Sequence, residues 1–209
     1  MNDPFECLGY IERKITSEQC ETFRKAFSNS NKLKHLTTMP DEKVKEFINI
    51  QRKEIVKRYA FCSLSEDFDD IIMWSHYASS HTGLVIGIEF EEEEIDHHFQ
   101  KIAYVDDLPQ FDVLKLAQFM EGCYEHLPYL LSDISIKAKP WSNEKEWRIW
   151  RNSPSYYQYK IENIRKIYFG VNCALETKKI VLDLLTDLPR DFQINEMRLG
   201  ANPIRLEYK

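Results

Sequence analysis

The sequence predicts a single α+β domain over residues 1–209, with a mixed, mainly antiparallel sheet and several helical insertions. Three observations predict this class. Short strand-like segments alternate irregularly with helical ones, and long helical stretches separate some strands, unlike the regular alternation of a doubly wound parallel sheet. A length of 209 residues with 43% hydrophobic residues is typical of one globular domain. No G-x-G-x-x-G or G-x-x-x-x-G-K-[ST] loop is present, so the common nucleotide-binding folds are not expected.

The first third of the chain predicts two amphipathic helices. Residues 17–29 begin with Ser17, a residue type that caps helix N-termini, and place Phe23 and Phe27 four residues apart on one face. Residues 40–58 begin with a proline and two acidic residues, and then repeat apolar residues at helical spacing. We therefore expect a long second helix with a charged outer face.

The remaining segments predict short strands separated by helices. In order, we expect a strand at 59–63, a helix at 69–77 that Gly83 terminates, a strand at 84–90, a helix start at the acidic run 91–94 and a strand at 101–105. Residues 111–138 predict mostly helix with a break at Pro128. The last segments predict strands at 144–150, 164–169, 192–197 and 204–208, with a helix at 175–185.

Composition and charge exclude several classes of function. The formal net charge of −6 argues against general nucleic-acid binding. The apolar runs are far shorter than the ~20 residues that span a bilayer, and no signal-peptide pattern is present, so no membrane partner is expected. Five widely spaced cysteines without a C-x-x-C pair predict reduced thiols in a cytoplasmic protein. His76 and His81 do not have a recognised metal-ligand spacing, and no metal site is predicted.

One candidate site lies in WSNEKEWRIW at residues 141–150. On a strand, Glu144, Glu146 and Arg148 share one face, while Trp147 and Ile149 point to the other face, which we expect to be the core. The charged face then lies toward solvent or a cleft. Two carboxylates beside a guanidinium are typical of sites that tune acid–base chemistry, and a salt-bridged, exposed sheet face is the simpler alternative.

A second candidate site lies in FCSLSEDFDDIIMWSHYASSHTGLVIGIEF at residues 61–90. Ser63 lies on the predicted first strand, and Trp74, His76 and Tyr77 lie on the short helix after it. The rings of Trp74 and Tyr77 either stack on a ligand or pack in the core. His76 is either a ligand-binding or general-base residue or, as we favour, a core histidine. Cys62 is predicted to be buried and unreactive.

Both segments resemble an uncharacterised bacterial family, domain of unknown function 2971, which is similar to some abortive-infection phage-resistance proteins. The resemblance rests on NDPFE at residues 2–6, on the segments at 61–90 and 141–149, and on IRKIYFGVNCALETKKIVLDLL at 164–185. In the family, NDPFE usually follows an N-terminal strand and helix of a few dozen residues. The resemblance therefore predicts a member that lacks this segment.

A strand serine followed much later by a strand E-x-E also resembles ADP-ribosyltransferases. This resemblance implies an enzyme that uses NAD as substrate, with Glu146 as the catalytic carboxylate and Glu144 orienting the acceptor. Ser63 would support the ribose, Trp74 and Tyr77 would stack on the nicotinamide, and His76 and Arg148 would contribute to substrate binding. The first-strand His or Arg that normally holds NAD would lie in the absent segment.

Two other functions remain open at this point. The first is a non-catalytic phage-defence or toxin–antitoxin component that recognises a protein or a nucleotide through the same cleft. The second is a nuclease-like enzyme that binds a metal through Asp69, Asp70, Glu144 and Glu146, which requires these carboxylates to converge. A ring-walled cavity favours nucleotide chemistry, whereas clustered carboxylates favour a metal.

Overall fold

The computed structural model describes residues 13–93, 95, 99–132, 135–151, 159–188, 191–200 and 206–208. The chain folds into two compact units. Unit 1 comprises Met1–Phe61, Lys101–Ser142 and Trp150–Ser155, and unit 2 comprises Cys62–Gln100, Asn143–Ile149 and Tyr156–Lys209. The expectation of a single domain over residues 1–209 stays a prediction. The NDPFE motif of the family resemblance lies outside the described residues.

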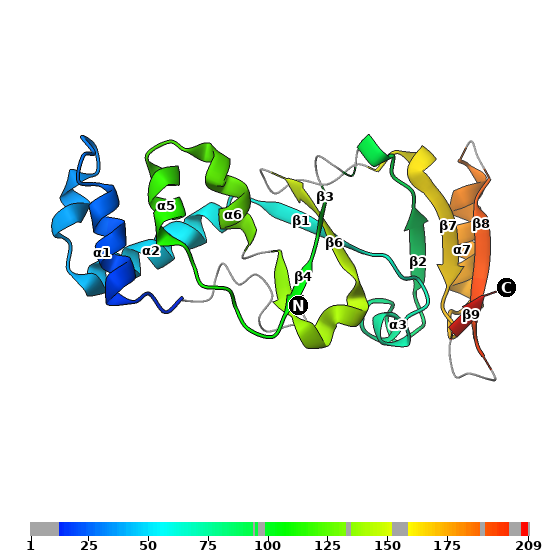
Figure 1. Cartoon of the computed structure of the whole chain (residues 1–209). Helices are drawn as coiled ribbons and strands as arrows, with labels where there is room; N and C mark the ends of the chain where they lie inside the picture. The colour runs from blue at the N-terminus through cyan, green and yellow to red at the C-terminus, as the bar shows by residue number, and fades with distance from the viewer. Residues whose placement is uncertain are drawn as a thin grey trace. The chain divides into compact units, whose positions relative to one another are not determined.

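Unit 1 consists mainly of helices around one hydrophobic core. Its elements are α1 (Ser17–Ala26), η2 (Lys34–Thr38), α2 (Asp41–Val56), β4 (Ala103–Val105), α5 (Val113–Met120), η3 (Tyr124–His126), α6 (Leu127–Ser132) and β5 (Ile136–Ala138) (Figure 1). The apolar faces of α1, α2 and α5 supply Phe23, Ile48 and Leu116, which are fully buried. β4 and β5 pair in parallel.

Two local predictions for unit 1 are wrong in detail. Thr16, not Ser17, is the N-cap of α1, because its hydroxyl accepts a hydrogen bond from the Gln19 N–H while the Gln19 side chain accepts one from the Thr16 N–H. Pro128 does not break a helix but lies in the first turn of α6, where its missing N–H costs nothing.

Unit 2 is built around a four-stranded sheet with the order β2-β7-β8-β9. Its elements are α3 (Ile71–Tyr77), β2 (Leu84–Ile88), η5 (Ile161–Asn163), β7 (Ile164–Phe169), α7 (Leu175–Thr186), β8 (Gln193–Leu199) and β9 (Leu206–Tyr208). β2 pairs antiparallel with β7, with Leu84 opposite Phe169, and β8 pairs antiparallel with β9. β7 and β8 pair in parallel.

A smaller sheet with the order β1-β6-β3 carries the two candidate segments. Its strands are β1 (Ala60–Ser65), β6 (Glu146–Arg151) and β3 (Phe99–Lys101), and the 3₁₀ helix η4 (Lys139–Glu144) precedes β6. The predicted strand at 101–105 is thus two strands, β3 and β4, and the predicted strand at 144–150 begins at Glu146. The α+β class and the mixed sheet are confirmed.

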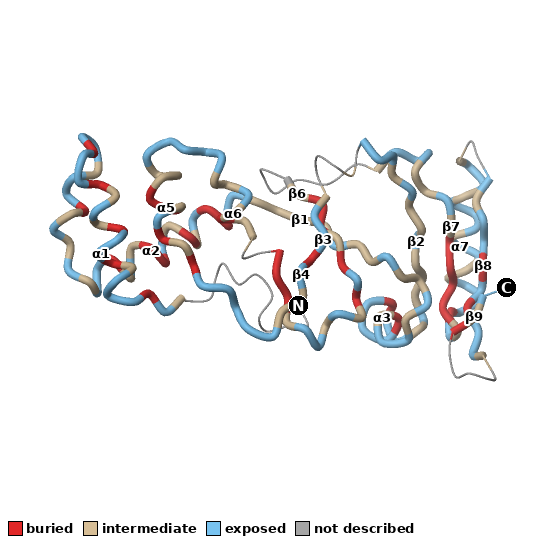
Figure 2. The backbone as a smooth tube through the Cα atoms, viewed as in Figure 1, coloured by how far each residue is buried: buried red, intermediate tan, exposed pale blue. Residues whose placement is uncertain are grey.

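The four-stranded sheet of unit 2 is covered on both faces by apolar side chains. On one face, Tyr168 and Met197 pack with Trp74 of α3. On the other, Ile167 and Phe169 pack with residues of α7. β7 is therefore the most buried strand of this sheet, as Figure 2 shows. In the described part of the chain, no helix is long and apolar enough to cross a membrane.

Candidate functional site

Strands β1 and β6 are neighbours in the small sheet, so they bring the two predicted segments together within unit 2. The Ser63 hydroxyl donates a hydrogen bond of 2.5 Å to Oε1 of Glu146. These two residues are 83 positions apart in the sequence. The predicted ribose-supporting serine and the predicted catalytic glutamate therefore contact each other.

Glu146 and Arg148 form an ion pair in the protein interior. Arg148 Nε donates to Glu146 Oε1 at 2.6 Å, and its second terminal nitrogen lies 3.3 Å from Oε2. The relative exposure of Arg148 is 0% and that of Glu146 is 3%. The predicted alternation along the strand is right for these two residues, but the expectation that they face solvent or a cleft is wrong. Charged groups are buried at acceptable cost only when paired in this way.

Glu144 forms hydrogen bonds with residues of α3 and β1. Its backbone ends η4, and its buried carboxylate accepts a hydrogen bond of 2.7 Å from the Tyr77 hydroxyl. The Ser65 hydroxyl donates to the Glu144 carbonyl at 2.7 Å. Lys145 then adopts a positive φ of 43°, which separates Glu144 from the regular alternation of β6. Glu144 therefore links the end of η4 to α3 and β1.

The structure places the ring residues of α3 differently from the sequence prediction. Trp74 has a relative exposure of 1% and packs in the sheet core, with its indole N–H donating to the Phe68 carbonyl at 2.6 Å. This environment favours the core alternative for Trp74. His76 is exposed, so the favoured prediction of a core histidine is wrong. Tyr77 is 54% exposed.

The end of α3 also differs from the prediction. The helix ends at Tyr77 with Ala78 as C-cap, and Gly83 follows five residues later. Ser79, Ser80 and His81 bridge this interval with positive φ angles. Gly83 nevertheless closes the turn, because its N–H donates to the Ala78 carbonyl at 2.9 Å.

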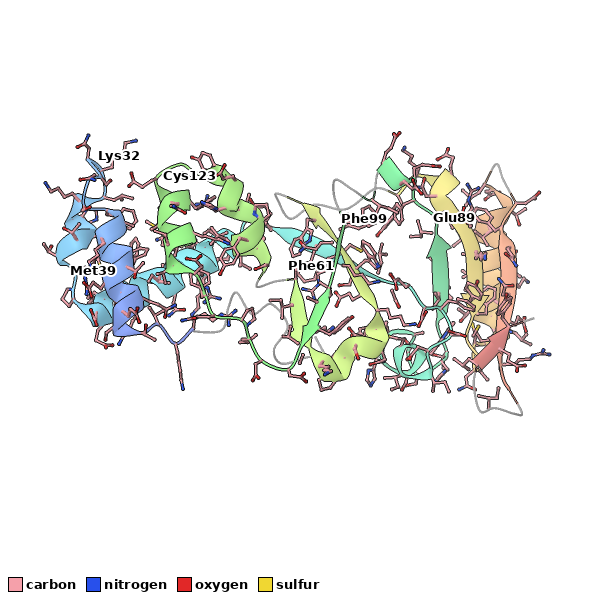
Figure 3. The ribbon with its side chains drawn as sticks, in the orientation of Figure 1. Lys32, Met39, Phe61, Glu89, Phe99 and Cys123 are labelled. Atoms are coloured by element: carbon pink, nitrogen blue, oxygen red, sulfur yellow. The ribbon has the colours of Figure 1, made fainter. Side chains whose placement is uncertain are left out.

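A cavity of about 620 Å³ opens beside Ser63, and every residue that lines it belongs to unit 2. The lining comes from the end of β1 and the loop after it, from β2, β3 and β7, and from Trp147 of β6. The residues are Ser63–Phe68, Val85–Phe90, Ile95, Phe99, Trp147, Arg165, Lys166 and Tyr168. Figure 3 labels two of them, Glu89 and Phe99. Of the predicted site residues, only Ser63 lines this cavity.

Aromatic rings form much of the cavity wall. Phe68 stacks on Tyr168, with ring centroids 4.5 Å apart and planes at 18°. Phe90 meets Phe99 edge to face at 4.6 Å. The indole N–H of Trp147 donates to Glu66 Oε1 at 2.7 Å, which fixes the orientation of this ring. Trp147 is only half-buried and lines the cavity, so its prediction as a core residue is wrong.

Burial raises the pKa of Tyr168, so this cavity-lining phenol stays neutral to a higher pH than an exposed tyrosine does. Its ring therefore offers an uncharged face in addition to the three phenylalanines. The wall thus combines apolar ring faces with polar side chains, as small-molecule sites usually do.

Five charged residues line the cavity, and most of them have a defined partner. Asp67 pairs with Lys145 at 2.7 Å, and this hydrogen bond together with the charge of Asp67 raises the pKa of Lys145. Glu89 pairs with Arg165 at 2.8 Å. Lys166 is the remaining cation of the lining.

The other predicted features of this region have ordinary roles. Asp70 caps α3 by accepting a hydrogen bond from the Met73 N–H. Among the residues the structure describes, no three His, Cys, Asp or Glu side chains are grouped to hold a metal ion. The carboxylate convergence required for the nuclease alternative is therefore not found there.

Cys62 is half-buried on the edge strand β1, with Sγ 3.1 Å from the Tyr159 hydroxyl, so its prediction as a buried residue is wrong.

Sequence reasoning missed most of the cavity. Phe68, Phe90, Phe99 and Tyr168 lie in segments that read as ordinary apolar strand or loop residues. Their only sequence signal is a density of aromatic residues next to charged ones, as in SEDFDD and IEFEEEE. Which of these rings face one another depends on the pairing of β2 with β7 and of β1 with β6.

The comparisons with known proteins give one match. The model of a family described as protein of unknown function (DUF2971) matches residues 73–149. This range is somewhat more than a third of the chain and runs from α3 to β6, so it includes the helix of the first candidate segment and the strand of the second. No curated protein matches the chain, and no solved structure matches it. The central part of the chain is thus similar to that family.

Proposed function

We propose that the chain binds a ring-bearing small molecule of the nucleotide class, with NAD as the candidate, in the aromatic-walled cavity of unit 2. The observation that carries this proposal is the cavity itself, about 620 Å³ in volume and lined by five aromatic residues. This volume lies within the usual range of small-molecule sites, roughly 300–1,000 Å³. Bases and nicotinamide rings bind by stacking on such faces.

The charges of the lining support a ligand that carries both positive and negative charge. Glu66 and Asp67 follow β1, close in sequence to the ring of Phe68, whereas Arg165 and Lys166 belong to β7. Oxidised NAD combines a cationic nicotinamide ring with phosphates. Aromatic faces and carboxylates attract a cationic ring, and basic side chains attract phosphate.

The binding test compares two tryptophans of the same strand. Trp147 lines the cavity, whereas Trp150 does not. In calorimetric titrations, Trp147→Leu is expected to weaken NAD binding about tenfold or more, through loss of a ring face and of its hydrogen bond to Glu66. Trp150→Leu is expected to bind NAD as the unaltered chain does. Absence of NAD binding to the unaltered, folded chain would refute the proposal.

ADP-ribosyl transfer is a second candidate, supported by the contact between Ser63 and Glu146. In this reaction the bond between nicotinamide and C1′ of the ribose breaks, and nicotinamide leaves with the bonding electrons. The acceptor nucleophile then bonds to C1′ and releases its proton. A carboxylate near C1′ stabilises the developing positive charge. Burial of Glu146 with Arg148 favours the binding function over this one, because a catalytic carboxylate must reach the ribose.

The transfer test must separate catalysis from folding, since Glu146→Gln removes the carboxylate that pairs with the buried Arg148. The double variant Glu146→Gln/Arg148→Gln removes both charges. Release of nicotinamide and transfer of label from NAD are expected to fall at least a hundredfold in both variants, with circular dichroism verifying the fold. Undiminished transfer in a folded double variant would exclude Glu146 as the catalytic group.

The proposed location and biological role follow from the family resemblance. We place the protein in the bacterial cytoplasm, in phage defence or as a toxin, acting alone on NAD or as a non-catalytic component that recognises a nucleotide or a protein. The net charge of −6 supports partners other than nucleic acid in general. Binding of NAD without turnover would support the non-catalytic form of the proposal.

A further inference from the structure

We propose that Lys166 binds the phosphate of the ligand and that Gly87 leaves the space in which its side chain lies. This inference rests on the proposed nucleotide-binding function and names the part of the ligand that the cavity recognises by charge. Neither residue belongs to the site that the sequence predicts.

The first support is the position of Lys166 in β7. Lys166 and Tyr168 are two residues apart on one strand, so their side chains leave the sheet on the same face. Tyr168 lies in the aromatic wall and stacks on Phe68. Both residues line the cavity, and Lys166 is only half-buried.

The second support is the close approach of β2 at Gly87. Gly87 is the direct cross-strand neighbour of Lys166, and a Cβ at position 87 would lie 3.1 Å from the Lys166 Cβ. That distance is shorter than ordinary van der Waals contact. Glycine at this position therefore lets the two strands pair while the stem of Lys166 crosses toward the cavity lined by both residues.

The third support is the set of charges around the cavity. Arg165, the other cation of the lining, already pairs with Glu89, and Asp67 pairs with Lys145. Among the described residues, Lys166 has no ion-pair partner. A lysine that lines a cavity and has no ion-pair partner there is suited to pair with an anionic group of the ligand.

The number of available cations in the lining limits how much negative charge the ligand can carry. With Asp67 and Glu89 paired to Lys145 and Arg165, Lys166 is balanced in the lining by Glu66, so the cavity suits a ligand of low net negative charge. The cavity therefore favours a mononucleotide, or the dinucleotide NAD with its cationic ring, over a nucleoside triphosphate.

The test uses two ligands that differ only in the phosphate, nicotinamide mononucleotide and nicotinamide riboside. Calorimetric titrations compare the unaltered chain with Lys166→Gln, Lys166→Arg and Lys179→Gln. Lys179 is an exposed lysine of α7 outside the cavity, so its variant removes the same charge elsewhere. The unaltered chain is expected to bind the mononucleotide about tenfold more tightly than the riboside.

Lys166→Gln is expected to abolish this tenfold preference and to change riboside affinity less than about twofold. It should also flatten the salt dependence of mononucleotide binding, which a merely structural role would leave unchanged. Lys166→Arg and Lys179→Gln are expected to keep the preference. Gly87→Ala, which crowds the lysine stem, is expected to weaken mononucleotide binding several-fold.

An unchanged preference in Lys166→Gln would overturn the role of Lys166 and leave the nucleotide-binding function standing. Failure of NAD, mononucleotide and riboside alike to bind the unaltered chain would instead overturn the proposed function, and this inference with it. The two failures are therefore distinguishable in the same series of titrations.

Discussion

At the scale of single residues, the strongest constraint on unit 2 is the buried pair of Arg148 and Glu146. Both side chains lie in the interior, and the shorter of their contacts is 2.6 Å. The Ser63 hydroxyl also donates a hydrogen bond to Glu146. Removing one member of such a pair leaves the other as an uncompensated charge, which costs more than the pair itself contributes.

Arg148→Met is accordingly expected to lower the free energy of unfolding by about 3–5 kcal/mol. Urea denaturation followed by circular dichroism measures this change. The matched control is Glu146→Gln/Arg148→Met, which removes both charges of the ion pair and is expected to recover part of the loss. A double variant less stable than Arg148→Met would contradict the assignment of the loss to a buried carboxylate that has lost its ion-pair partner.

The same residues show what the sequence predicts at this scale. Strand alternation correctly places Glu146 and Arg148 on one face, since that follows from backbone geometry alone. Their burial depends on the partner that β1 brings from 83 residues away, and no local pattern contains this information. For the same reason, Trp147 and Ile149 share a predicted core face, yet only Ile149 is buried.

At the scale of elements, the start of α1 shows how local contacts fix a boundary. Thr16 and Gln19 exchange two hydrogen bonds that satisfy two otherwise unpaired N–H groups. Thr16→Ala is expected to lower the free energy of unfolding by about 1 kcal/mol. Thermal or urea denaturation measures the change.

Thr22 provides the control for that prediction. It lies inside α1, and its hydroxyl donates to the Glu18 carbonyl of the same helix. Thr22→Ala is expected to be neutral or slightly stabilising, because alanine has the higher helix propensity. An equal loss in the free energy of unfolding of both variants would show that the capping box adds no stability of its own.

Elements with strong local periodicity were predictable, and those held by distant partners were not. Residues 164–169 form β7 with the predicted bounds, since their apolar residues and flanking turn signals mark a buried strand. β5 was predicted as part of a helix, because three residues carry no periodicity and its parallel partner β4 lies about 30 residues away in the chain. The cavity depends on several such pairings at once.

At the scale of the whole molecule, the chain connectivity predicts how the two units unfold. Each unit is assembled from three separate chain segments, and the strands β1, β3 and β6 each have residues in both units. Neither unit corresponds to a continuous piece of chain that could fold by itself. We therefore predict one cooperative unfolding transition, as expected for the single domain that the sequence predicts.

The four tryptophans allow a direct test. Trp141 and Trp150 belong to unit 1, and Trp74 and Trp147 belong to unit 2. In a Trp141→Phe/Trp150→Phe background, fluorescence reports unit 2 alone.

Adding Leu36→Ala, at a fully buried position of the unit 1 core, is expected to lower the free energy of unfolding by about 2–5 kcal/mol. If folding is cooperative, the fluorescence midpoint of unit 2 falls together with the midpoint from circular dichroism. Ile167→Val in unit 2 should shift both midpoints by a smaller amount. A fluorescence midpoint that ignores Leu36→Ala would mean that the units unfold separately, as two domains.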